Sequence, residues 1–276
     1  MDRQRGGGIL SKEPPVRYYS SFSDDFSQTA CQDYVLPEQY RWVRSDWRSR
    51  LRSGIIYAAA LAFSSVYCRL FLHVRIRGSR LLRRDKNSGI FLYGNHTQPI
   101  GDVFDPALAC FPRRIYTLAS PANLGIPVLG RLLPYLGALP IPGSIAGMKE
   151  LSQALTLRLE QKACIVVYPE AHVWEYCTQI RPFSDTSFKY PVKYGVPAYC
   201  MTAVYRKRLL GRRPSCTLYV DGPFLPDASL PPRRQASELH RRIYACMVAR
   251  SRQSNCSYIR YAPAAEAPAP SPDSSK

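Results

Sequence analysis

Residues 90–105 read IFLYGNHTQPIGDVFD, an apolar run that ends at a glycine and is followed by polar side chains. The run Ile90–Tyr93 predicts a short strand, and Gly94 predicts the turn that ends it. His96 and Asp102 come just after that turn. Because ligands of open α/β sheets bind outside the carboxyl ends of the strands, this stretch predicts a functional histidine–carboxylate pair at such an end.

The rest of the chain predicts strands and helices of the same kind of fold. Ala163–Tyr168 is a continuous apolar run, which is typical of a strand buried on both faces of a parallel sheet. Residues 145–162 predict an amphipathic helix from the spacing of their apolar side chains. Further strands are predicted at 114–119, 137–141, 197–204 and 216–220, and further helices at 103–110, 124–136 and 239–251. The alternation predicts an α/β fold, a mainly parallel mixed sheet flanked by helices, over residues 87–261.

The side chains after the first strand are suited to acid–base chemistry. An imidazole titrates near neutrality, so His96 is a candidate general base that takes a proton from a hydroxyl. Asp102, bonded to the other ring nitrogen, would fix the tautomer and stabilise the imidazolium. The chain has no Gly-x-Ser-x-Gly motif, so the hydroxyl would belong to a substrate and not to a protein serine. On the pattern alone, a purely structural histidine at a strand end stays open.

The spacing of this pair carries a geometric prediction. Five residues separate His96 from Asp102. A regular helix would turn these two positions about 240° away from each other, so the pair must meet through a non-helical turn. Asp105 is a rival orienting carboxylate, although it lies farther along the chain.

A second polar turn follows the strand at 163–168 and reads PEAH. Because turns after neighbouring parallel strands meet at one crevice, Glu170 and His172 are predicted to lie near His96. Glu170 is either an acceptor-binding carboxylate or a hydrogen-bonded turn residue, and His172 is interpreted as a packing or substrate contact. Downstream, Arg181 carries a guanidinium fork that matches phosphate geometry.

The histidines and cysteines predict no metal site. The four histidines (His73, His96, His172 and His240) and the nine cysteines show no ligand motif, so neither a metal nor another cofactor is expected. Several cysteines lie inside apolar runs, which indicates reduced, buried thiols and a cytosolic compartment.

Residues 41–86 combine basic and apolar character and predict a membrane-associated helical segment. Trp42, Trp47 and three arginines precede an uncharged run, Ser53–Cys68. Its sixteen residues fall short of the ~20 that a membrane-spanning helix needs. The basic and tryptophan flanks favour a helix that lies in, or dips into, one leaflet. The alternative is a buried core helix of a soluble protein.

Composition and charge limit the remaining choices. The net charge of +18 implies an anionic partner, namely a lipid surface, a phosphorylated substrate or nucleic acid. Residues 1–40 are polar and rich in Gly, Pro and Ser, and they predict a disordered leader without a cleavable signal peptide. Residues 262–276 are rich in Pro and Ser and predict a disordered tail.

Four segments in order resemble the glycerophospholipid acyltransferase family, the 1-acylglycerol-3-phosphate acyltransferases and their relatives. GNHTQPIGD (94–102) is similar to the family's Asn-His…Asp block, and VVYPEAH (166–172) is similar to its Phe-Pro-Glu-Gly block. FKYPVKYGVPAYCMT (188–202) resembles a later helix-to-strand segment, and the apolar stretch 53–72 resembles the membrane-binding helices of such enzymes. The resemblance covers residues 53–260.

The resemblance implies transfer of an acyl group from acyl-CoA or acyl-carrier protein to a lysophospholipid hydroxyl in phospholipid synthesis. It implies that the enzyme acts at the cytoplasmic face of a membrane, without a cofactor. His96 and Asp102 would be catalytic, and the expected substrate-binding residues are Asn95, Thr97, Glu170, His172 and Arg181.

Three departures from the family pattern bear on the acceptor. The family has four residues between the histidine and the aspartate, where this chain has five. Its arginine between the two blocks has no match in residues 136–147, and His172-Val173 replaces its Thr-Arg. Two other interpretations stay open: a non-catalytic lipid-binding or scaffold protein of this fold, and a basic nucleic-acid-binding protein, for which no reading motif is present.

Overall fold

The computed structural model describes residues 14–26, 33–84, 86–98, 100–209, 211 and 213–266. Its centre is a seven-stranded sheet in the order β2-β8-β7-β3-β6-β4-β5. These strands are β2 (Val74–Arg77), β3 (Ile90–Gly94), β4 (Ile115–Ala119), β5 (Ala138–Pro140), β6 (Cys164–Val167), β7 (Ala198–Arg206) and β8 (Ser215–Phe224). Neighbouring strands run parallel except for the antiparallel pair β7–β8. The predicted mainly parallel mixed sheet is therefore confirmed.

The central strands are those predicted from continuous apolar runs. β3 lies between β6 and β7, with Ile90 opposite Cys164 and Phe91 opposite Ala198. Every residue of β3 and β6 is buried, because helices cover both faces of the sheet. The turn after β3 therefore lies at the middle of the edge formed by the carboxyl ends of the parallel strands.

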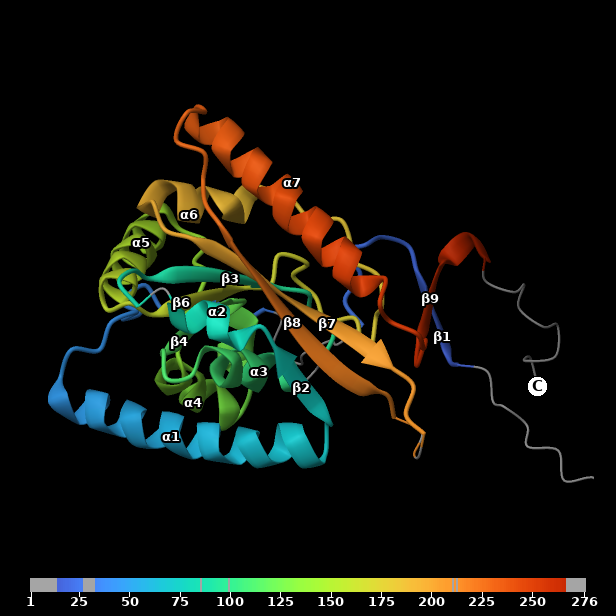
Figure 1. Cartoon of the computed structure of the whole chain (residues 1–276). Coiled ribbons are helices and arrows are strands. Elements are labelled where there is room, and N and C mark those ends of the chain that lie inside the picture. Colours follow the sequence, from blue (N-terminus) through green and yellow to red (C-terminus); the bar gives the residue numbers. More distant parts are fainter. Residues whose placement is uncertain are drawn as a thin grey trace, which may run out of the picture.

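Helices form a layer on each face of the sheet (Figure 1). One face carries α5 (Ile145–Glu160), α6 (Lys189–Tyr194) and α7 (Pro232–Ser251). The other carries α1 (Trp47–Leu70), α2 (Ser79–Arg84) and α3 (Gly101–Cys110), with α4 (Leu129–Leu136) packed against α1. The predicted helix 145–162 is confirmed as α5, and its Leu151, Leu155 and Leu159 face the core.

Helix α1 lies along the outside of the molecule (Figure 1). Asp46 caps it by accepting a hydrogen bond of 2.8 Å from the Ser49 N–H. One side packs on α3 and α4, and large apolar side chains are exposed on the rest of the helix: Trp47, Leu51, Ile55, Phe63, Val66 and Leu70. By length and composition α1 could cross a membrane, and only 11% of its most apolar window is buried. It is therefore not the buried core helix of the alternative interpretation.

The N-terminal region departs from the predicted disordered leader over residues 14–26. There β1 (Val16–Tyr19) pairs in parallel with β9 (Arg260–Pro263), which places the predicted start of the tail inside a strand. A 3₁₀ turn, Ala264–Glu266, follows. The physical reason is aromatic packing, since Trp174 is surrounded by Tyr19, Phe22, Phe26 and Tyr261 at ring-centroid distances of 5.0, 6.3, 5.2 and 4.8 Å. Residues 1–13, 27–32 and 267–276, also predicted to be disordered, lie outside the described residues.

Candidate active site

The turn after β3 brings His96 and Asp102 together. His96 Nδ1 lies 2.8 Å from Asp102 Oδ2, and the same oxygen accepts the Gln98 N–H at 2.8 Å. Asp102 stands in the first turn of α3, while His96 precedes that helix, so the contact is made through a non-helical turn as predicted. Asp102 is buried, whereas the His96 side chain is 21% exposed. Within the described part of the chain nothing bonds Nε2, the nitrogen that a general base would use.

Tyr168 completes this pair, and the sequence analysis gave it no role. Its ring stacks on the His96 ring with centroids 4.4 Å apart, and its hydroxyl donates to the Asp102 carbonyl at 2.6 Å. The stack requires a glycine at the end of β3, because a Cβ on Gly94 would lie 2.6 Å from Tyr168 Cε1. Gly94 and Tyr168 together fix the orientation of the His96 imidazole ring.

Asp105 does not orient His96. Its carboxylate is buried and accepts a hydrogen bond of 2.7 Å from Gln98 Nε2. Burial, and then the neighbouring Asp102 charge, raise the pKa of Asp105 to about 7. Asp102 is therefore the carboxylate that orients the histidine in this structure.

We expect Asp105→Asn to change how stability depends on pH. Because the folded pKa lies above that of an ordinary aspartate, Asp105 destabilises the fold as pH rises from about 4 to 7. The shift corresponds to about 4 kcal/mol. Urea unfolding at several pH values should show that the free energy of unfolding falls less with rising pH for Asp105→Asn than for the wild type. The exposed Asp33→Asn is the control. An unchanged pH profile would contradict this assignment.

Two of the predicted substrate-binding residues are bonded to the neighbouring strand β7. Asn95 Oδ1 accepts the Ala203 N–H at 2.8 Å, and Thr97 Oγ1 shares a hydrogen bond of 2.8 Å with the Tyr205 hydroxyl. Both side chains are buried. Their contacts hold the turn after β3 on the sheet, and neither side chain faces solvent.

The second polar turn meets the first, as predicted. Glu170 Oε2 accepts the backbone N–H of His96 at 3.1 Å, and the Trp174 N–H donates to the His96 carbonyl at 3.0 Å. Glu170 also forms a buried ion pair with Arg181 at 3.0 Å. Desolvation raises the pKa of Glu170, and the Arg181 charge opposes that rise. The carboxylate thus supports the backbone beside His96.

Arg181 is buried, with 2% of the residue exposed, so its guanidinium does not face solvent. Besides Glu170, it donates to the carbonyls of His172 and Phe22 and lies 4.7 Å from the Trp174 ring centroid. These contacts tie the N-terminal segment to the loop that carries Glu170. His172 itself is partly exposed, with Nδ1 3.5 Å from Asp25 Oδ2.

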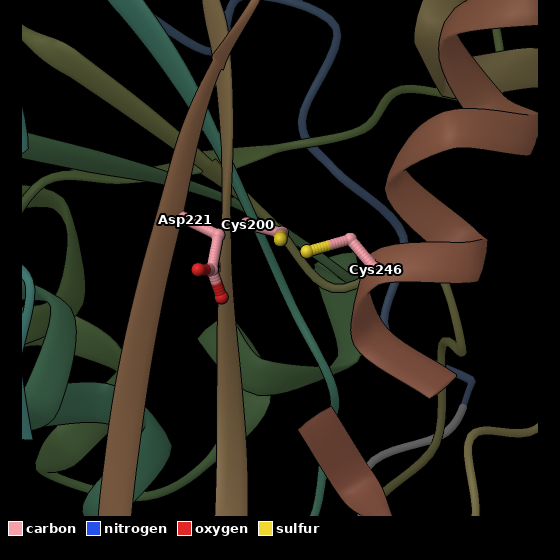
Figure 2. Close-up of side chains that lie close together, drawn as sticks. All are labelled: Cys200, Asp221 and Cys246. Atoms are coloured by element: carbon pink, nitrogen blue, oxygen red, sulfur yellow. The ribbon is translucent and has the colours of Figure 1, made fainter. Parts of the chain in front are cut away.

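One cluster of potential metal ligands lies elsewhere, between β7, β8 and α7. Cys200 and Cys246 point their sulfur atoms toward each other, and Asp221 lies beside them (Figure 2). Their ligand atoms lie within 4.8 Å of one another, but both Asp221 oxygens are bonded to Arg250, at 2.8 and 2.6 Å. A structural zinc site has four protein ligands. Three candidates, one of them held by an arginine, do not fit such a site.

Comparisons with known proteins identify the fold. No protein-family model and no curated protein sequence matches the chain. The crystal structure of the 1-acyl-sn-glycerophosphate (LPA) acyltransferase PlsC from Thermotoga maritima does match, with a TM-score of 0.51. This chain shares the PlsC fold. The similarity covers 75% of this chain and 84% of that chain at 16% sequence identity.

The PlsC fold agrees with the architecture described above. An apolar N-terminal helix precedes a mixed sheet whose central strands end in the His96 and Glu170 turns. The similarity to PlsC is one of fold.

Proposed function

We propose that the protein is a membrane-surface O-acyltransferase that moves a fatty acyl group from an acyl thioester to a lysophospholipid hydroxyl. The observation that carries the proposal is the His96–Asp102 contact of 2.8 Å at the end of the central strand of a PlsC-like fold. The donor is acyl-CoA or acyl-carrier protein. The transfer requires no metal or other cofactor.

In the proposed mechanism His96 Nε2 takes the proton of the acceptor hydroxyl. Asp102 holds the proton on Nδ1 and stabilises the imidazolium. The acceptor oxygen attacks the thioester carbonyl carbon, and backbone N–H groups stabilise the tetrahedral oxyanion. When the intermediate collapses, the carbon–sulfur bond breaks and the thiolate takes the proton from His96. The leaving thiol has a free pKa near ~8.5, so it departs readily.

The surrounding residues divide into two proposed roles. Asn95, Thr97, Glu170 and Arg181 are positioning residues, because each is buried and bonded within the protein. His172 is partly exposed next to the His96 turn and is the predicted substrate contact that a ligand can reach. A phosphate on the acceptor is then recognised by groups other than Arg181.

We propose that α1 attaches the enzyme to the cytoplasmic leaflet. Its exposed apolar side chains face away from the protein, and arginines stand at both of its ends. Apolar burial and attraction to anionic lipid both favour such a helix at a membrane surface.

We expect Phe63→Asp combined with Val66→Asp to release the protein from membranes. These residues are 56% and 55% exposed, so the change removes apolar surface that faces away from the protein, together with the ring contacts of Phe63 with Tyr67 and Phe104. Liposome co-sedimentation should show at least about a tenfold loss of binding, because a charge is costly in the lipid interior. Leu225→Asp, at an exposed apolar residue directly after β8, is the control. Full retention on liposomes would exclude α1 as the attachment.

The acyl-transfer proposal is tested with the purified full chain. The assay supplies labelled acyl-CoA or acyl-carrier protein and a panel of lysophospholipids, and the products are identified by mass spectrometry. A single favoured acceptor would define the reaction. If no acceptor is acylated but the chain still binds liposomes, the protein is a lipid-binding scaffold. Salt-sensitive binding to nucleic acid that exceeds binding to anionic liposomes would favour the third interpretation.

A further inference from the structure

A basic groove of about 990 Å³ lies between the C-terminal end of α1, the edge strand β2 and helix α2. We call it the β2 groove. Its basic side chains are Arg69, His73, Arg75, Arg83, Lys207 and Arg208, and its apolar side chains include Leu61, Ile76, Leu108 and Phe111. His96, Asp102 and Glu170 do not line it, so it is separate from the candidate active site.

The charge in the β2 groove is uncompensated within the described residues. No described Asp or Glu lines it, and none of its arginines or lysines forms an ion pair with a described carboxylate. Arg83 donates to the Ser79 hydroxyl at 3.3 Å, and Arg208 lies 3.5 Å from His73 Nδ1. Several cations around one concave surface create a strong local attraction for an anion, and arginine forks suit phosphate oxygens in particular.

The surroundings of the β2 groove indicate the kind of anion. Arg69 on its rim is flanked by the exposed Leu70 and Phe71, and Leu209 is fully exposed next to Arg208. The exposed apolar side chains of α1 therefore continue to the mouth of the groove. A ligand that puts a phosphate among the arginines and an acyl chain against Leu108 and Phe111 would fill both parts.

We propose that the β2 groove binds the phosphate headgroup of an anionic membrane phospholipid. The proposal rests on the membrane contact of α1 but not on acyl transfer, and it goes beyond the proposed catalytic function. The bound lipid would fix the end of α1 and the β7–β8 connection at the headgroup level. It would thereby orient the His96 turn relative to the membrane.

The test uses the full chain and a soluble probe, dihexanoyl phosphatidic acid below its micelle-forming concentration, in isothermal titration calorimetry. Arg75→Gln combined with Arg208→Gln should weaken binding at least about tenfold, because hydrogen bonds to a charged phosphate are lost. Arg83→Gln with Lys207→Gln provides a second pair. Arg233→Gln with Arg234→Gln, two exposed residues at the start of α7, removes the same charge elsewhere and should change affinity less than about twofold.

Further probes separate the sources of phosphate. Glycerol 3-phosphate should bind more weakly than the lipid because it lacks the acyl chains. Coenzyme A binding that is lost in the groove variants, with phosphatidic acid binding unchanged, would assign the groove to a soluble acyl donor and overturn the proposal. Equal losses in the groove and control variants, or no binding by the wild type, would overturn it as well.

His96→Ala distinguishes this site from the active site. It should bind dihexanoyl phosphatidic acid like the wild type, since His96 is not part of the groove. Loss of binding in His96→Ala would place the lipid in the active-site crevice instead. Because binding needs no turnover, failure of this proposal and failure of acyl transfer are separate results.

Discussion

Replacing His96 by alanine is expected to reduce acyl transfer by about 10²- to 10⁴-fold while leaving the fold intact. A positioned general base contributes about 10² to 10⁴ in rate, and no other described imidazole contacts Asp102 to replace it. The His96 ring is partly exposed, and its contacts are a single bond to Asp102 and the stack on Tyr168. Removing the ring should therefore lower the rate of acyl transfer without unfolding the protein.

Asp102→Asn keeps the His96 imidazole but changes the group that orients it, so it tests the role of Asp102. The amide no longer stabilises an imidazolium, and it can favour the tautomer whose free nitrogen is Nδ1. We expect kcat to fall by about 10² to 10⁴ with KM little changed. His172→Ala is the matched control, since that residue is proposed to touch substrate and should change KM more than kcat. Wild-type kcat in His96→Ala would exclude the mechanism even if the protein binds lipids.

The central strands and the His96–Asp102 contact could be predicted from sequence because each depends on local patterns. Apolar runs bounded by Gly or Pro marked β3 and β6, and parallel pairing brought their turns together. The apolar, arginine-flanked run marked α1, whose exposed face the structure then showed. These features need no information about distant partners.

The features that were missed depend on contacts between distant segments. β1 pairs with β9, about 240 residues later, whereas polar and Pro-rich composition predicts disorder for all of β1 and for residues 262–263 of β9. Residues 74–77 fall within the predicted membrane-associated helical segment 41–86, although the alternation in Val-Arg-Ile-Arg is typical of an edge strand. Tyr168 gave no signal, because its role exists only where β6 lies beside β3.

Glu170 and Arg181 show a different limit of sequence analysis. The family resemblance implies that Glu170 binds the acceptor, and the guanidinium of Arg181 matches phosphate geometry. The structure instead pairs the two with each other under the N-terminal segment. A charged residue after a buried strand looks the same in sequence whether it faces a ligand or a partner eleven residues away. Only the burial of both side chains distinguishes the two cases.

Replacing Arg181 by leucine is expected to destabilise the protein by about 3–5 kcal/mol at pH 7. The change leaves the Glu170 carboxylate buried without its counter-charge, and it removes the donors to the His172 and Phe22 carbonyls. Urea unfolding measures this loss. Arg242→Leu on α7, which removes a partly exposed arginine near Glu238, is the control and should cost about 1 kcal/mol or less.

Two further measurements identify the unpaired carboxylate as the cause. Burial already raises the pKa of Glu170, and loss of Arg181 would raise it further, so the variant should regain stability as pH falls from 7 toward 5. Combining Glu170→Gln with Arg181→Leu should recover part of the loss, because a neutral amide is cheaper to bury. A double variant as unstable as Arg181→Leu would mean that the lost bonds to the N-terminal segment dominate. Glu170→Gln alone leaves the Arg181 guanidinium buried without a counter-charge, so it should lower stability. Because Glu170 also accepts the His96 N–H, the same change should lower kcat, which would make this buried pair a positioning device for the base.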